Sequence, residues 1–312
     1  MKSPVLCLMG PTATGKTELA IELVGELPVD IISVDSVMVY RGMDIGTAKP
    51  DTATLKIAPH RMIDIRDPAD PYSAAQFRDD ALKQIKDIHA AGRLPLLVGG
   101  TMLYFRALLQ GLSVLPMANP AVRASLLAEA EAKGWNVLHQ RLEEIDPDAA
   151  KRIHRNDSQR LQRALEVYEL TGQPLSVLQR RTEGGLNDTY QVVKIVLMPE
   201  DRKALHERIE KRFQVMLKQG FIEEVESFYT RDDLNEDLPA MRSVGYRQIW
   251  QYLDGKMEKA QLHEKGVVAT RQLAKRQITW LRSEADASSL DPQQTRLKQL
   301  VSHVKYQVHT FV

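Results

Sequence analysis

The segment that most restricts the fold is a glycine-rich motif near the amino terminus, of the form G-x4-G-K-T. It lies between an apolar run, residues 4–9, and a segment with helical apolar spacing, residues 16–27. Glycines let the backbone curl so that successive N–H groups face phosphate oxygens, the lysine adds a positive charge, and the last hydroxyl can bind magnesium. The motif predicts a phosphate-binding loop made of Gly10, Pro11, Thr12, Ala13, Thr14, Gly15, Lys16 and Thr17. A glycine-rich turn that only caps a helix is the alternative.

Further apolar runs make this motif part of a larger pattern. The β-branched residues 29–34 predict a second strand, and residues 94–98 predict a third, directly before Gly99-Gly100. Between them, Ser73 and Gln76 are typical of a capping box that begins a helix. Strands that alternate with helices pair in parallel. We therefore expect an α/β fold whose core is a P-loop NTPase-like parallel sheet.

A mainly helical segment interrupts this pattern. Its expected helix caps are Asn119-Pro120, Asp146-Pro147 and Asn156-Asp157. Because no strand-like run occurs within it, we expect an all-helical insertion at residues 118–186. Residues 1–117 and 187–312 are then the P-loop catalytic core, and the last part of that core is expected to be mainly helical.

Composition removes several classes of protein. The 312 residues include one cysteine, Cys7, which excludes a disulfide framework and a cysteine-based zinc site. The apolar runs fall short of the roughly 18 residues that a membrane-spanning helix needs, so no membrane partner is expected. The short run after Lys2 leads straight into Gly10, so we expect no signal peptide and a cytoplasmic protein. A formal net charge of +1 leaves a nucleic-acid partner to be decided by local clustering.

Two polar residues follow predicted strands at the edge where open α/β sheets hold their ligands. Asp35 follows the strand at residues 29–34 and is a candidate general base or magnesium ligand, with a plain turn as the alternative. Thr101 follows Gly99-Gly100 and is a candidate contact to a phosphate oxygen, with a simple N-cap as the alternative. The third predicted strand ends without an acid, which is unusual for an enzyme that hydrolyses nucleoside triphosphates.

Basic side chains gather in two parts of the chain. Five lie near the start of an insertion helix: Lys151, Arg152, Arg155, Arg160 and Arg163. Six recur in the carboxy-terminal part, with Tyr246 and Trp280 among them: Arg242, Arg247, Arg271, Lys275, Arg276 and Arg282. Basic and aromatic side chains together are typical of proteins that bind single-stranded RNA loops. A solvated helix face is the alternative for either cluster alone.

Seven short motifs in a fixed order resemble those of one enzyme family. They are residues 10–17, 33–40, 43–50, 99–104, 163–166, 245–248 and 271–277. The series resembles the bacterial tRNA dimethylallyltransferases. The resemblance implies a P-loop fold that grips dimethylallyl diphosphate and transfers its dimethylallyl group to the N6 amine of the adenosine immediately 3′ of the anticodon in tRNA. It also implies Mg²⁺ as the cofactor, bound at Thr17, and no consumption of ATP.

Together with the patterns above, the resemblance predicts the site. Asp35, Thr101 and Lys16 are the expected catalytic residues, and the eight loop residues 10–17 are the expected diphosphate site. The residues expected to contact the anticodon stem-loop of tRNA are Asp35, Ser36, Val37, Met38, Thr101, Arg123, Gln159, Arg160, Leu161, Gln162, Arg163, Arg242, Ser243, Val244, Gly245, Tyr246, Arg247, Lys275, Arg276, Gln277, Ile278, Thr279, Trp280, Leu281 and Arg282. We expect a monomer. The chain departs from the family pattern at Met38, Met102 and Leu273.

Other interpretations stay open on the sequence. A P-loop small-molecule kinase would share the loop and a lid-like insertion but would bind and turn over ATP. A nucleotide-gated RNA-binding protein would show no chemistry, and prenyltransferases of free adenine nucleotides have no evident use for the basic helices.

For transfer to tRNA, the target adenine must leave its stack. We therefore expect the insertion to be a mobile clamp for tRNA, hinged near residues 116–120 and 184–185.

Overall fold

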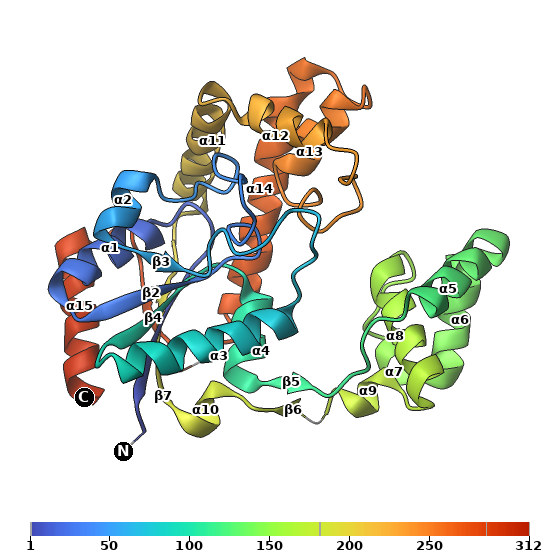
Figure 1. Cartoon of the computed structure of the whole chain (residues 1–312), viewed down its shortest axis with the longest axis horizontal. Helices are drawn as coiled ribbons and strands as arrows, with labels where there is room; N and C mark the ends of the chain where they lie inside the picture. Colours follow the sequence, from blue (N-terminus) through green and yellow to red (C-terminus); the bar gives the residue numbers. More distant parts are fainter. Residues whose placement is uncertain (1, 181, 285, 312) are drawn as a thin grey trace. The chain divides into compact units, whose positions relative to one another are not determined.

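The computed structural model describes residues 2–180, 182–284 and 286–311, and the chain divides into two compact units. The first unit consists of Met1–Leu108 and Leu186–Val312. Its core is a six-stranded parallel sheet in the order β3-β2-β4-β1-β7-β8 (Figure 1). The strands are β1 (Pro4–Met9), β2 (Val29–Val34), β3 (His60–Arg61), β4 (Leu94–Gly99), β7 (Gln191–Leu197) and β8 (Ser288–Leu290). The predicted α/β fold with a parallel core is confirmed.

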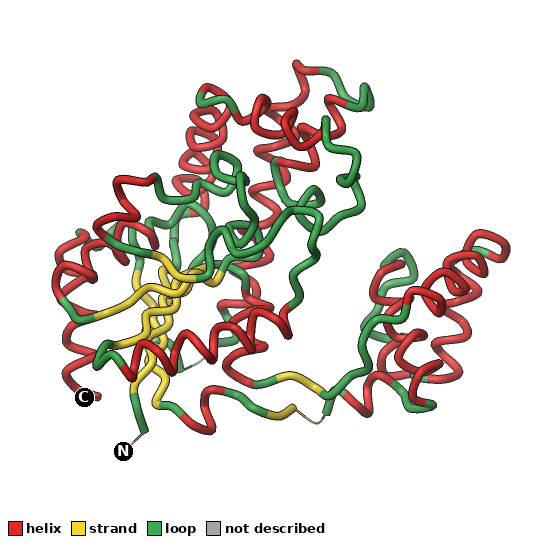
Figure 2. The backbone as a smooth tube through the Cα atoms, viewed as in Figure 1, coloured by secondary structure: helices red, strands yellow, loops and turns green. Residues whose placement is uncertain are grey.

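Helices cover both faces of this sheet, which explains why the central strands β1 and β4 are apolar along their whole length. Leu6 and Leu8 of β1 pack in one cluster with residues of α1 (Lys16–Glu26) and α15 (Leu297–Phe311). Val5 and Cys7 alternate with them, face the other side and are equally buried. Helix α3 (Ala74–Ala90) contacts β2 and β4, and its predicted capping box between Ser73 and Gln76 is present. In Figure 2 the strands of this unit lie between helices, and loops gather at one end of them.

The loops that follow β1, β2, β4 and β7 meet at one edge because the four strands are parallel and adjacent. Gly99 at the end of β4 pairs in register with Met9 of β1 on one side and Val34 of β2 on the other. The phosphate-loop motif, Asp35 and Thr101 thus begin from neighbouring strand ends.

The other helices of the chain outside the insertion complete the first unit. They are α2 (Thr52–Ile57), α4 (Met102–Gln110), α10 (Leu186–Thr189), α11 (Arg202–Lys218), α12 (Phe221–Tyr229), α13 (Tyr246–Leu253) and α14 (Lys259–Leu281). The expectation of mainly helical structure after β7 is confirmed. None of the helices in the described residues is long and apolar enough to cross a lipid bilayer.

The second unit consists of Leu109–Gly185. Its helices are α5 (Pro120–Lys133), α6 (Trp135–Ile145), α7 (Pro147–Ala150), α8 (Ser158–Thr171) and α9 (Leu175–Leu178), which enclose a separate apolar core. The side chains of Asn119, Asp146 and Asp157 accept hydrogen bonds from first-turn N–H groups, which confirms the three predicted caps.

The expectation of an all-helical insertion at residues 118–186 needs correction. Strand β6 (Thr182–Glu183) lies inside that range and pairs antiparallel with β5 (Leu112–Ser113), which lies before it. This pairing joins the entering and leaving chain, so the unit begins at Leu109 rather than at residue 118. Strands of two residues, like β3 in the main sheet, are too short to show an alternating pattern in the sequence.

Candidate active site

The motif at residues 10–17 forms a tight loop between β1 and α1. Ala13 and Gly15 have left-handed backbones, with φ of 64° and 87°, and Gly15 is the N-cap of α1 without a side chain to cap it. A Cβ on Gly10 would lie 2.9 Å from the carbonyl oxygen of Leu197, so the loop packs closely on the end of β7. The first N–H groups of α1 lack intrahelical partners, and an anion site at these groups stays a prediction.

Lys16 lies over this loop and carries a strongly shifted pKa. Its Nζ donates a hydrogen bond to the carbonyl oxygen of Pro11 at 2.6 Å. Burial is the main cause that lowers the pKa of Lys16 to about 7; the positive charge of Arg212 adds to the effect and the carboxylate of Asp35 opposes it. A bound anion would favour the protonated lysine again.

Two arginines of α11 that sequence reasoning missed lie beside the loop. The guanidinium of Arg212 donates to the carbonyl oxygen of Thr47 at 3.3 Å, and its pKa is lowered by burial and by the nearby Arg208, against the effect of Asp35. A Cβ on Gly15 would lie 3.7 Å from Nη2 of Arg208. The signal in the sequence was an Arg-x3-Arg spacing in the first helix after β7, which puts both side chains on one helix face.

Asp35 and Thr101 are brought together by the ends of β2 and β4. Oδ1 of Asp35 accepts hydrogen bonds from the N–H groups of Val37 at 2.8 Å and Met38 at 3.1 Å, so the turn expected as the alternative exists. The Thr101 hydroxyl accepts a hydrogen bond from the N–H of Ser36 at 3.0 Å. The backbone N–H of Thr101 donates to the carbonyl oxygen of Val34. The backbone thus holds Asp35 in place through one carboxylate oxygen, which leaves the other for a ligand.

Gln277 of α14 joins the phosphate loop to the end of β4. Its Oε1 accepts from the N–H of Thr12 at 2.9 Å, and its Nε2 donates to the carbonyl oxygen of Gly100 at 2.8 Å. From the sequence we expect Gln277 to contact tRNA and all eight loop residues to bind diphosphate. In this structure both ends of the Gln277 amide, and the N–H of Thr12, are engaged within the protein.

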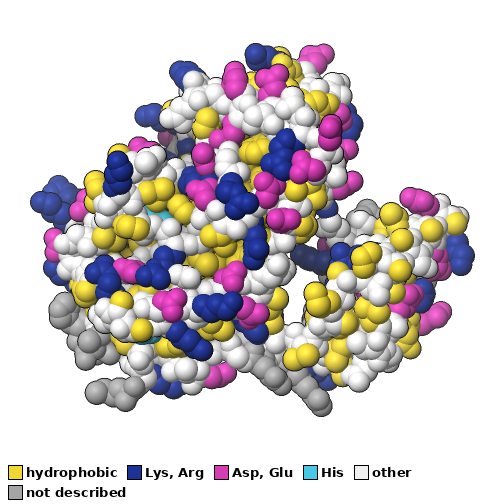
Figure 3. Space-filling model, in the orientation of Figure 1, with side chains coloured by type: hydrophobic (Ala, Val, Ile, Leu, Met, Phe, Trp, Pro, Cys, Tyr) yellow, Lys and Arg dark blue, Asp and Glu magenta, His cyan; other side chains and the backbone are white. Residues whose placement is uncertain are grey.

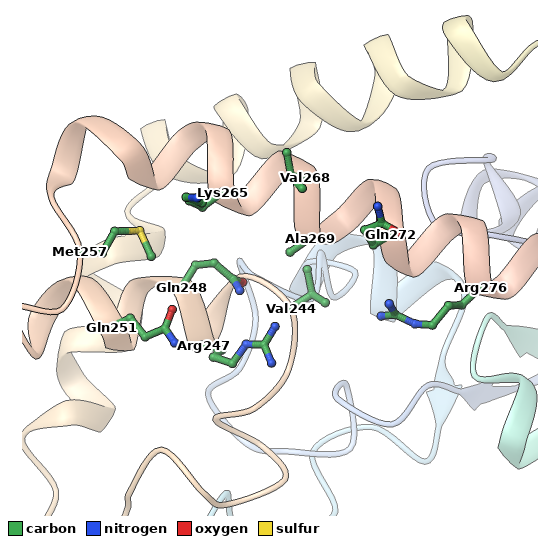
Figure 4. A pocket seen from close by; sticks show the side chains of 10 residues that line it. All are labelled: Val244, Arg247, Gln248, Gln251, Met257, Lys265, Val268, Ala269, Gln272 and Arg276. Carbon is green, nitrogen blue, oxygen red and sulfur yellow. The ribbon is translucent and has the colours of Figure 1, made fainter. Parts of the chain in front are cut away.

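Helices α13 and α14 line a groove of about 330 Å³, and it contains residues from two stretches that the sequence predicts to contact RNA, residues 242–247 and 275–282. Figure 4 shows Arg247 from one helix and Arg276 from the other extending into the same space, with Val244 between them. The remaining lining residues are Gln248, Gln251, Met257, Lys265, Val268, Ala269 and Gln272. The groove offers an apolar floor with amide and cationic groups around it.

Several residues expected to contact tRNA have side chains buried in the protein. Tyr246 is fully buried, and its hydroxyl donates to Glu224 at 2.5 Å, so it is not the exposed stacking residue that the sequence predicted. Trp280 remains 38% exposed beside Arg106. The other buried side chains in the predicted segments are Leu161, Ile278 and Leu281. The exposed ones include Gln159, Arg160, Arg242, Arg247, Lys275, Arg276, Thr279 and Arg282.

In the insertion, the buried Glu166 fixes two of the predicted RNA-binding arginines. Its carboxylate accepts from Arg123 at 2.9 Å, from Arg163 at 2.6 Å and from the N–H of Asn119 at 2.7 Å. Burial opposes ionisation of Glu166, but these hydrogen bonds lower its pKa below the usual range. Arg163 also donates to Pro116, so it supports the helix packing, whereas Arg160 is 73% exposed and open to a ligand.

One face of the molecule can be followed for its distribution of charge. On the face shown in Figure 3, basic and acidic side chains are interspersed. This matches the formal net charge of +1. A polyanion would therefore have to be recognised through local clusters such as the α13–α14 groove.

Fold and site together define a P-loop protein with three cationic side chains and one carboxylate at its phosphate loop. The chain belongs to the IPP transferase family, which it matches over residues 38–284. It is 62% identical over 294 residues to the tRNA dimethylallyltransferase of Alkalilimnicola ehrlichii, covering 94% of this chain and 92% of the relative. It is 57% identical over 308 residues to that of Thioalkalivibrio sulfidiphilus, covering 98% and 95%. The resemblance expected from the motifs is confirmed.

Solved structures show the same fold. The tRNA isopentenylpyrophosphate transferase of Bacillus halodurans matches with a TM-score of 0.72 and 34% identity, over 99% of this chain and 98% of that one. A eukaryotic dimethylallyltransferase described as acting on tRNA matches with a TM-score of 0.78 and 26% identity, over 98% and 77%.

The shifted pKa of Lys16 predicts how anion binding depends on pH. With a pKa of about 7 in the free protein, Lys16 loses its charge as the pH rises, so binding of inorganic diphosphate must then take up a proton. We expect the Kd for diphosphate to rise above about pH 7, by at most tenfold per pH unit, and to rise less in Lys16→Arg, whose side chain stays charged. Isothermal titration calorimetry at several pH values measures the Kd for diphosphate of the wild type and of Lys16→Arg. Parallel curves for the two proteins would contradict the prediction, because the titration of diphosphate itself is common to them.

Proposed function

We propose that this chain is a tRNA dimethylallyltransferase. It transfers the dimethylallyl group of dimethylallyl diphosphate to the N6 amine of the adenosine immediately 3′ of the anticodon and releases diphosphate. The observation that carries the proposal is the grouping of Lys16, Arg208 and Arg212 around the phosphate loop, with Asp35 at the adjacent strand end. Family membership supports a prenyltransferase and does not favour the kinase alternative.

The cations suit a reaction in which diphosphate leaves. The bond between the allylic carbon and the diphosphate oxygen breaks, and its electron pair stays on the diphosphate. Preorganised N–H groups and the charges of Lys16 and Arg212 stabilise that developing charge more than they stabilise the bound substrate. Burial disfavours the charged forms of Lys16 and Arg212 in the free protein, as their lowered pKa values indicate. A bound anion stabilises these charged forms and is therefore held strongly.

Asp35 is the group that can accept the proton of the amine. The adenine amine is a poor nucleophile because its lone pair is delocalised into the ring, and it loses a proton as the new carbon–nitrogen bond forms. Oδ1 of Asp35 is used in the turn with Val37 and Met38, which orients the carboxylate, and the other oxygen takes the proton. Thr101 positions this turn through Ser36.

Magnesium fits the residues present only as a partner of the substrate. Among the described residues there is no group of three or more His, Cys, Asp or Glu side chains that could hold a metal ion. Mg²⁺ often takes only one or two protein ligands and completes its shell with phosphate oxygens and water. Thr17 is the candidate ligand, and the ion would supply further neutralisation of the diphosphate.

RNA binding is the task of the exposed basic residues. The α13–α14 groove and Arg160 of the insertion offer phosphate contacts, and the target adenine must be flipped out of the anticodon loop to reach Asp35. The exposed members of the predicted segments carry this role, and the buried ones shape the helices.

We expect the enzyme to work as a monomer in the cytoplasm, with the insertion as a mobile clamp, and without ATP.

The proposed reaction predicts a defined product. Incubation of the protein with dimethylallyl diphosphate and an anticodon stem-loop should add the mass of one dimethylallyl group to the RNA, with release of diphosphate. A stem-loop with guanosine at the target position is the control and should stay unmodified. ATP should be neither needed nor consumed. Conversion of ATP to ADP with transfer of the phosphoryl group to a small molecule, and without modified RNA, would favour the kinase instead.

Removal of the proposed base should affect the rate and not binding. Asp35→Asn keeps an oxygen for the turn N–H groups but cannot take a proton, so we expect the saturated transfer rate to fall by about 100- to 10,000-fold. The affinities for both substrates should stay within about tenfold. Single-turnover rates and equilibrium binding separate the two effects, and Asp79→Asn, at an exposed acid of α3, is the matched control. A wild-type rate in Asp35→Asn would remove Asp35 from the mechanism.

The groove arginines should affect RNA binding and not chemistry. Arg247→Ala and Arg276→Ala should weaken stem-loop binding, and each should reduce the slope of log affinity against log salt by about 0.7, the value for one single-strand phosphate contact. The rate at saturating RNA should change little. Lys259→Ala removes an equally exposed charge roughly 25 Å away on the same helix and is the control. Unchanged salt slopes in both arginine variants would show that the groove is only a solvated surface.

A further inference from the structure

Gln277 makes two hydrogen bonds that span most of the chain length. Its Oε1 accepts a hydrogen bond from the N–H of Thr12, 265 residues earlier in the chain. Its Nε2 donates to the carbonyl oxygen of Gly100, 177 residues earlier. The amide thus joins three elements: the phosphate loop, the end of β4 and helix α14. These two hydrogen bonds orient the amide toward the phosphate loop and the end of β4.

The fit around Gln277 is close. A Cβ on Gly100 would lie 2.6 Å from Nε2 of Gln277 and 3.0 Å from the carbonyl oxygen of Gly10. The Gly100 backbone therefore lies against both the amide and Gly10, and the absence of a side chain at position 100 is what admits the amide. The partly buried amide determines the direction of the Thr12 N–H, and so which N–H groups of the loop remain for an anion.

We propose that Gln277 is a positioning residue of the diphosphate site, which acts through the phosphate loop rather than through tRNA. The inference rests on the proposed function for its substrate, dimethylallyl diphosphate. Near neutral pH, a primary amide offers at this length, and without charge, both an acceptor for Thr12 and a donor for Gly100. When the amide is lost, the loop N–H groups no longer keep one fixed arrangement, and the anion must order them on binding.

Two substitutions separate the roles of shape and hydrogen bonding. Gln277→Met has similar length and no charge but removes both hydrogen bonds. Gln277→Glu keeps an acceptor for Thr12, loses the donor to Gly100 and adds a negative charge near the anion. We expect Gln277→Met to raise the Kd for inorganic diphosphate, measured without RNA, by about three- to tenfold and Gln277→Glu to raise it by more than about tenfold at pH 8.

A pH series gives a signature that a general structural role would not produce. Below the pKa of the carboxyl group introduced by Gln277→Glu, that group is protonated, so it offers an O–H donor to Gly100 and keeps its acceptor for Thr12. The Kd ratio of Gln277→Glu to wild type should therefore fall toward one as the pH is lowered, whereas the ratio for Gln277→Met should stay constant. Gln261→Glu, an exposed cap residue at the start of the same helix, should match wild type at every pH.

Stem-loop affinity decides between the two roles of Gln277. We expect it, and its salt dependence, to be unchanged in both Gln277 variants. Weaker stem-loop binding with wild-type diphosphate binding would overturn the inference and make Gln277 an RNA contact, as would wild-type behaviour of both variants in the diphosphate titration. If wild type binds diphosphate with this dependence on Gln277 but modifies no RNA, the proposed function fails while the assignment of Gln277 to the loop stands.

Discussion

The close approach of β2 and β4 at their carboxyl ends is the constraint on which the site depends. A Cβ on Gly99 would lie 2.0 Å from the carbonyl oxygen of Val34, so this spacing admits only glycine. The same spacing lets Thr101 reach both Val34 and Ser36 by hydrogen bonds, which fix the turn that holds Asp35. The carboxylate is therefore placed by backbone geometry and not by an ion pair. A larger residue at position 99 would separate the strands and move the proposed base away from the phosphate loop.

The electrostatics of the loop follow from burial. Lys16 and Arg212 repel each other, and burial lowers the pKa of both, while Asp35 partly compensates them. These buried side chains are poorly solvated before a substrate binds. The attraction between them and a bound diphosphate would therefore act at a lower effective dielectric constant than in water. In the proposed reaction the charge on the diphosphate grows as the carbon–oxygen bond breaks. One set of cations would then contribute to both binding and rate.

The sequence predicted the parts of the structure that depend on local patterns. The strands β1 and β4 are continuous apolar runs and β2 is rich in β-branched residues. The caps at Asn119, Asp146 and Asp157 are single side chains beside their own helices. Features that depend on chain segments far apart were missed. The positions of Arg208 and Arg212 depend on where α11 returns to the sheet edge. Tyr246 looked like a stacking residue because arginines flank it, but it lies against Phe221 and donates to Glu224, and no local pattern reveals that.

Helix α14 shows how one element can serve two substrates without mixing their contacts. Successive residues on an α-helix point about 100° apart. Arg276 therefore faces the groove that α14 shares with α13, while its neighbour Gln277 faces the phosphate loop. The helix is 23 residues long, and Ala274 and Ile278 pack it against α11, which carries Arg208 and Arg212. An RNA held in the groove would thus be bound to the same rigid element that positions the loop. Any shift of α14 on RNA binding would reach the diphosphate site through Gln277, because its two hydrogen bonds leave the loop little freedom to move independently.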